Sequence, residues 1–303
     1  MKKLLFRLSL SVLGLMSCEK PTTQKSDATL LLKVKFDSTL TRLDAFGQPA
    51  TIAAGNATQN PAFNSISLHN IELVPTALTS IQGGSVVYRG KENSTGGAEA
   101  VDFDLAIIKK NGETFLEIPL SEIKAGTYKY IRTSVTYQNY AVRFNLTNVP
   151  TVGSVNNQKG TVASFVGFNT YISDLQVANQ TKSVNDDKLQ GYWAFETQLN
   201  SPYSSYNQIY SGDAARTTVV NPIHSTTPIP VGSCLVTGSF VGSNLVITGN
   251  ETEDIVLELS YCTNNSFEWQ DTNGNGEWDI DVSNTTVEPV IDMGLRGLQA
   301  VVK

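Results

Sequence analysis

The stretch "ATLLLKVKF", residues 28–36, alternates apolar side chains with lysines, so that Leu32, Val34 and Phe36 fall on the opposite side from Lys33 and Lys35. Successive side chains of a β-strand point to opposite faces of its sheet, and this pattern therefore predicts a strand with one buried face. Similar stretches recur at 66–74, 113–120 and 191–199, with no helical segments between them. We therefore expect an all-β fold over residues 29–303, a β-sandwich of mainly antiparallel strands with long loops and little helix.

Local patterns add detail to this prediction. The apolar alternation changes phase between residues 66–68 and 71–73, which indicates a β-bulge near His69 and Asn70. Asn111 and Gly112 both tolerate positive φ, so they predict a hairpin between strands at 100–108 and 113–120. Helix is expected only as single turns, within 60–65 and 119–126.

The two cysteines in the second half of the chain bound a group of three predicted strands. Segments 233–240, 244–249 and 254–262 resemble successive strands of a meander, with Cys234 at its start and Cys262 at its end. In a meander these cysteines lie at opposite ends, too far apart for a disulfide, which needs Cα atoms within about 7 Å. We expect two buried thiols, unless one strand leaves the sheet and permits a bridge.

Residues 198–232 are rich in proline, serine and tyrosine and show no periodicity. They predict a long loop, or a connection at which the domain divides into two subdomains. Tyr203, Tyr206 and Tyr210 are candidate ligand contacts, because exposed aromatic rings stack on sugars and anchor protein partners. The alternative is that these rings cover the edge of the sandwich.

The N-terminus combines Lys2, Lys3 and Arg7 with a short apolar run, which predicts a signal peptide over residues 1–17. Residues 15–18, Leu-Met-Ser-Cys, resemble the bacterial lipobox, in which the cysteine becomes the acylated first residue of the mature protein. This resemblance implies lipidation of Cys18, a flexible tether over 18–28 and attachment to a membrane. Glu19 in place of aspartate favours the outer membrane. The alternative is an ordinary secretory signal that contains a cysteine.

Charge limits the partners of the chain. Loss of residues 1–17 removes three positive and no negative charges, so the formal net charge falls from −6 to −9. An acidic protein is unsuited to bind nucleic acid, which requires a basic surface. A metal cation, a glycan or a protein partner remains compatible with this charge.

Two stretches resemble known families. Residues 116–135 are similar to an element of β-sandwich lipoproteins of Bacteroidota, and residues 30–40 resemble the start of MbnP-like lipoproteins and related copper proteins. These resemblances imply a β-sandwich in the cell envelope. In the copper proteins the metal lies between histidines and a modified tryptophan, which would require His69 and His224 to meet at one site here.

Segment 271–281, "DTNGNGEWDID", places oxygen-bearing side chains at the alternate positions of an EF-hand-type loop, with glycine at its sixth position. The pattern resembles the calcium loops of dockerins and thrombospondin-type repeats. Position 12 is Val282, which cannot bind a metal, although Asp281 could substitute in a shortened loop. The alternative is an Asn-Gly turn that needs no ion. The predicted Ca²⁺ ligands are Asp271, Asn273, Asn275, Glu277, Asp279 and Asp281.

The sequence therefore predicts a lipid-anchored binding or structural module of the cell envelope, with a calcium-stabilised loop. A carboxylate-dependent glycoside hydrolase is the first alternative, and its acids could come from Asp102 and Asp104, from Asp186 and Asp187, or from segment 251–254. A copper-binding lipoprotein is the second. Gly-x-Ser-x-Gly and His-Glu-x-x-His motifs do not occur in the chain, and an enzyme is the less favoured expectation.

Overall fold

The computed structural model describes residues 27–214, 218–230 and 234–303, and this part of the chain is all-β. Its only helical elements are three 3₁₀ turns, η1 (Phe103–Leu105), η2 (Leu120–Glu122) and η3 (Ser204–Tyr206). The predicted fold class is therefore confirmed. Cys18 and most of the predicted tether lie outside the described residues, as does the predicted signal peptide. Within the described ranges no helix is long and apolar enough to cross a membrane.

The largest sheet is mostly antiparallel and contains strands from the whole length of the described chain. Its members are β1 (Thr29–Asp37), β3 (Ala62–Val74), β4 (Ser85–Arg89), β7 (Ile108–Lys110), β8 (Thr114–Pro119), β10 (Tyr130–Val149), β11 (Gly153–Phe165), β14 (Tyr192–Thr197), β15 (Ile209–Asp213), β16 (Leu235–Phe240), β18 (Ile255–Cys262), β20 (Asp279–Asp281), β21 (Thr286–Val287) and β23 (Leu298–Val302).

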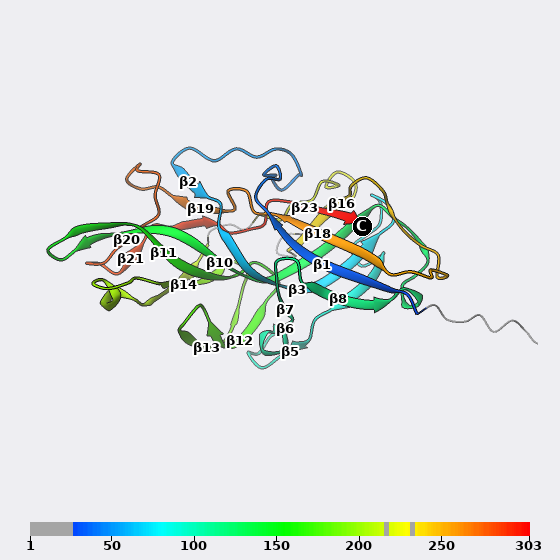
Figure 1. Ribbon diagram of the computed structural model, residues 1–303, viewed down its shortest axis with the longest axis horizontal. Helices are drawn as coiled ribbons and strands as arrows, with labels where there is room; N and C mark the ends of the chain where they lie inside the picture. Colours follow the sequence, from blue (N-terminus) through cyan, green and yellow to red (C-terminus); the bar gives the residue numbers. More distant parts are fainter. Residues whose placement is uncertain (1–26, 215–217, 231–233) are drawn as a thin grey trace, which may run out of the picture.

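Three smaller sheets complete the described structure. The first contains β5 (Glu92–Asn93), β6 (Ala100–Asp102), β12 (Thr170–Gln176) and β13 (Thr181–Lys188). The second pairs β9 (Gly126–Tyr128) with β17 (Leu245–Ile247), and the third contains β2 (Asn56–Gln59), β19 (Phe267–Gln270) and β22 (Val290–Asp292). Figure 1 shows β2, β19, β20 and β21 at one end of the elongated molecule, and β16, β23 and the C-terminus at the other.

Strand β10 connects the two ends of the molecule. Its residues 130–134 pair with β16 on one edge and with β3 on the other. Farther along, the strand pairs with β11, and residues 145–147 pair with β20. Residues 131–142 are buried without interruption, as expected for a central strand that is covered on both faces.

The predicted β-bulge lies at His69. Ser134 of β10 pairs with Asn70, whereas the next residue, Val135, pairs with Leu68. His69 is therefore the extra residue of β3, and the change of apolar phase in the sequence is explained.

The turn at Asn111 and Gly112 is present, but the hairpin predicted around it is wrong. Glu113 N–H donates to the carbonyl of Lys110 at 3.1 Å, and Gly112 has φ of +81°. The strands then diverge, because β7 pairs with β3 and β8 pairs with β1. The turn therefore joins two different strand neighbours instead of closing a two-stranded ladder.

The predicted meander over 233–262 is also wrong. Strand β16 pairs with β10 and β23, β17 pairs with β9, and β18 lies between β1 and β23. Cys234 and Cys262 are both buried and are not joined by a disulfide. Burial raises the pKa of the Cys234 thiol to about 12, and it also raises that of Cys262.

Of the two predicted helical turns, the one within 119–126 is present as η2, whereas 60–65 runs into β3. Residues 62–65 instead belong to the long strand β3, which pairs with β10.

The main hydrophobic core runs the length of the molecule, from Leu30 in β1 to Trp278 beside β20. Segment 198–232, predicted as a loop or a subdomain connection, contributes buried Leu199, Val220 and Ile223 from its described parts. It also contains η3 and β15, which extends the large sheet beyond β14. A second, smaller core lies under β12 and β13.

Candidate functional site

Asp271 organises the first half of the predicted calcium loop. Its Oδ1 accepts hydrogen bonds from the N–H groups of Gly274 at 2.9 Å and Asn275 at 3.1 Å, and its Oδ2 accepts one from Gly276 at 2.8 Å. Gly274 and Gly276 adopt φ of +73° and +77°, a region that L side chains rarely occupy. The glycines therefore let the backbone wrap around this carboxylate.

The next polar residues of the loop converge on Asp279. The side-chain amides of Asn273 and Asn275 donate to Asp279 Oδ2 at 2.5 and 2.8 Å. Their own Oδ1 atoms accept backbone N–H groups, from Asn275 and Glu277 respectively. Asp279 is only 6% exposed, and its Oδ1 has no hydrogen-bond partner among the described residues.

A carboxylate that the sequence did not indicate lies at the base of this loop. Glu288, 7% exposed, follows β21. Its Oε1 accepts hydrogen bonds from the N–H and hydroxyl groups of Thr272 at 2.8 and 2.7 Å, and its Oε2 accepts one from Asp279 N–H at 3.0 Å.

Asp281 and Glu277 occupy different settings. Asp281 accepts hydrogen bonds from the N–H and hydroxyl groups of Ser283 and from the Asn284 amide. The hydrogen bond from the Ser283 hydroxyl is the main reason why the pKa of Asp281 is lowered. Its carboxylate therefore stabilises the turn that follows β20. The carbonyl of Glu277, the predicted backbone ligand, accepts a hydrogen bond from the Trp269 indole at 3.2 Å.

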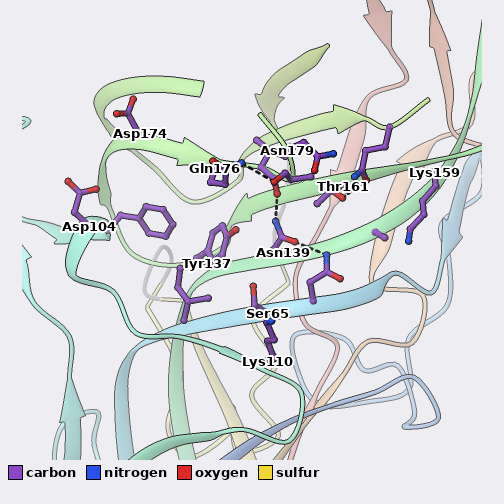
Figure 2. A pocket seen from close by; sticks show the side chains of 17 residues that line it. Ser65, Asp104, Lys110, Tyr137, Asn139, Lys159, Thr161, Asp174, Gln176 and Asn179 are labelled. Atoms are coloured by element: carbon purple, nitrogen blue, oxygen red, sulfur yellow. Dashed lines mark hydrogen bonds between the residues drawn. The ribbon is translucent and has the colours of Figure 1, made fainter. Parts of the chain in front are cut away.

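A groove of about 870 Å³ forms a second candidate site. Figure 2 shows Tyr137 and Asn139 of β10 in its middle, with Asp104 and Asp174 toward one end and Lys159 toward the other. Further amides and hydroxyls line it, from Asn64, Ser65, Thr161, Gln176, Asn179 and Gln198.

Hydrogen bonds fix several of these polar groups. The Asn139 amide donates to the carbonyl of Val177 at 2.8 Å, and its Oδ1 accepts from Asn64 at 2.7 Å. Thr161 donates its hydroxyl to Gln198 Oε1 at 2.7 Å. These hydrogen bonds fix the positions of the Asn64, Asn139, Thr161 and Gln198 side chains in the groove.

A buried carboxylate holds one wall of the groove. Glu196 of β14, 2% exposed, accepts hydrogen bonds from three consecutive N–H groups, those of Ala178, Asn179 and Gln180. Because these donors belong to the turn between β12 and β13, Glu196 ties that turn to the large sheet.

A smaller pocket of about 340 Å³ lies at the bulge of β3. His69 Nε2 lies 2.7 Å from Glu92 Oε1, and the imidazole stacks on Phe168 at 5.9 Å between ring centroids. Burial lowers the pKa of His69 in spite of this contact with Glu92. Arg89 also donates to Glu92.

The remaining predicted site residues lie apart from these three places. His224 packs edge-on against Phe46, with ring centroids 4.7 Å apart, whereas His69 contacts Glu92 and Phe168. Tyr210 is buried against Phe195, and its burial raises its pKa. Tyr203 and Tyr206 are half-buried on the main core. The three tyrosines therefore do not form one exposed face.

Within the described ranges, no three aspartate, glutamate, histidine or cysteine side chains form a group that could hold a metal ion. The loop at 271–279 also offers side-chain amide and backbone carbonyl oxygens, which calcium accepts as ligands.

No family model, curated protein or solved structure matches the chain.

Sequence patterns missed the groove and Glu288 because both depend on strand neighbours. The groove joins residues of the consecutive strands β10, β11 and β12 with residues of β3 and β7, which lie much earlier in the chain. Glu288 lies 16 residues beyond the Thr272 groups that it accepts from, outside any calcium-loop motif.

Proposed function

We propose that the protein is a binding module of the bacterial cell envelope, anchored through acyl chains on Cys18 and stabilised by calcium at residues 271–279. The groove beside β12 takes the ligand, an uncharged and hydroxyl-rich molecule such as a glycan. The N-terminal sequence pattern supports the anchor, and the composition of the groove supports the class of ligand.

The chemistry of the groove lining carries this proposal. Amide and hydroxyl side chains both donate and accept hydrogen bonds, as do the hydroxyl groups of a sugar. The charged residues of the groove balance, because Lys110 and Lys159 oppose Asp104 and Asp174. An uncharged polar ligand therefore fits this surface better than a strongly anionic or cationic one.

Removal of either of two exposed amide side chains from the groove should weaken glycan binding. Gln176→Ala and Asn179→Ala each remove a side chain that lines it. In a glycan panel read by calorimetry on the mature chain carrying Cys18→Ser, each variant should bind roughly fivefold more weakly, as expected for loss of one hydrogen bond worth about 1 kcal/mol.

Asn244→Ala and Gln299→Ala are the matched controls, because both replace exposed amides outside the groove lining. They should leave affinity unchanged. If all four variants bind a glycan equally well, the ligand lies elsewhere and the groove proposal is wrong.

The carboxylate-dependent hydrolase remains the second candidate, because Asp104 and Asp174 both line the groove. Measuring reducing ends after incubation of the glycan panel with the protein distinguishes a hydrolase from a binding module. Release of reducing sugar by the unaltered protein, lost in Asp174→Asn while binding persists, would favour the hydrolase over the binding module.

A further inference from the structure

Six carboxylates are buried within the described ranges, and half of them have a cationic partner. Arg132 pairs with Glu72 at 3.1 Å, and Arg296 pairs with Glu268 at 2.9 Å and with Asp292 at 3.1 Å. An ionised carboxylate removed from water is costly unless an opposite charge or hydrogen-bond donors compensate it. The six are Glu72, Glu196, Glu268, Asp279, Glu288 and Asp292.

Glu196, Asp279 and Glu288 have no lysine or arginine partner in the described part of the chain. Glu196 accepts three backbone N–H groups and Glu288 accepts three hydrogen bonds from Thr272 and Asp279, whereas the Oδ1 atom of Asp279 accepts none from the described residues. The backbone N–H of Asp279 donates to Glu288 Oε2 at 3.0 Å, so these two buried acidic residues are in direct contact. Two neighbouring buried anions without a cation are a place where a positive ion would stabilise the fold.

The unpaired oxygen points to the position of that ion. Asp279 Oδ1 is buried without a partner in the described part of the chain, while its Oδ2 gathers the amide N–H groups of Asn273 and Asn275. This carboxylate therefore lies inside the loop that Asp271 organises. The Oδ1 atoms of both asparagines each accept one N–H, and a carbonyl oxygen can accept a second interaction.

We propose that Glu288 completes the calcium site, supplying from outside the loop the acid that Val282 cannot supply at position 12. Glu288 is held between Thr272 and Asp279, at the second and ninth positions of the loop. Asp281 is committed to the turn at Ser283 and Asn284. This inference rests on the calcium-stabilised loop of the proposed function and deepens it by naming the missing ligand.

Calcium fits this set better than a transition metal. Its ligands would be carboxylate, amide and backbone carbonyl oxygens, which hard cations prefer, and calcium accepts six to eight of them in flexible geometry. Magnesium demands a stricter octahedral arrangement and retains its waters, so it should compete poorly.

Two tryptophans make the site observable. The Trp269 indole donates to the carbonyl of Glu277, and the Trp278 indole donates to the carbonyl of Glu288 at 3.0 Å. A terbium ion in the calcium position would therefore lie near two indoles that can sensitise its luminescence.

The experiment titrates the mature chain carrying Cys18→Ser with Tb³⁺ and then with Ca²⁺, reading sensitised luminescence. Glu288→Gln keeps the shape of the side chain and removes its charge, and it should weaken Ca²⁺ binding by about tenfold or more. Asp281→Asn is the matched control and should leave affinity unchanged. Circular dichroism of each variant establishes that it is folded, and a thermal melt with calcium and with EDTA gives an independent readout.

The possible results distinguish calcium binding by the loop at 271–279 from the role of Glu288 as a ligand. Weaker binding in Glu288→Gln but not in Asp281→Asn supports the assignment. If the unaltered protein binds Ca²⁺ and Glu288→Gln binds it equally well, Glu288 is not a ligand, although the calcium loop stands. If Asp281→Asn alone loses affinity, position 11 supplies the acid. If the unaltered protein binds neither Tb³⁺ nor Ca²⁺, the calcium-stabilised loop and the role of Glu288 are both wrong.

Discussion

Burial of His69 should make the stability of the folded protein depend on pH. Burial lowers the pKa of His69 below its ordinary value of 6.5, so the folded protein resists a proton that the unfolded chain accepts. The unfolded state then binds more protons, and stability falls as pH drops from about 6.5 toward the folded pKa. Each unit of pKa difference corresponds to about 1.4 kcal/mol.

The measurement is the free energy of unfolding by urea between about pH 7.5 and 5.5, a range that contains the ordinary pKa of histidine. His69→Gln should flatten the dependence on pH, whereas His224→Gln, which alters an exposed histidine, should not. Equal slopes for the unaltered protein and His69→Gln would show that another group controls stability in this range.

At the scale of elements, Gly112 should be required by the turn between β7 and β8. Its φ of +81° is strained for any residue with a side chain, so Gly112→Ala should cost about 1–2 kcal/mol of unfolding free energy. Gly126→Ala is the control, because its φ is not positive and an added Cβ would meet only the Tyr128 ring, at 3.9 Å. Denaturant unfolding measures both, and equal losses would contradict the argument.

The same elements show what the sequence could predict. Alternation in residues 28–36 identified a strand, and the phase change around His69 located a bulge, because both depend on which face a side chain occupies. Strand partners were not predictable in this way. Strand β18 pairs in parallel with β1, more than 200 residues earlier, and periodicity contains no information about that neighbour.

The candidate sites also contain a part that local sequence predicts and a part that depends on strand pairing. The side chains of 271–279 are local in sequence, so their convergence could be predicted from spacing alone. Glu288 reaches the loop only because β20 and β21 pair antiparallel, with Ile280 opposite Val287. The groove likewise requires β3 to pair with β10, a strand much later in the chain, and local spacing contains no information about that pairing.

At the scale of the whole molecule, the continuous core predicts cooperative unfolding. Residues from β1 and from the segment around Trp278 belong to one buried cluster, and β10 is hydrogen-bonded at both ends of the molecule. Trp193, Trp269 and Trp278 belong to β14, β19 and the segment before β20, whereas strands throughout the chain contribute to far-ultraviolet circular dichroism. Thermal or urea unfolding followed by tryptophan fluorescence and by circular dichroism should therefore give coincident transitions. Two separated transitions would instead indicate two subdomains. Because Trp193 precedes residues 198–232 and Trp269 and Trp278 follow them, a division within that segment would make fluorescence change in both transitions.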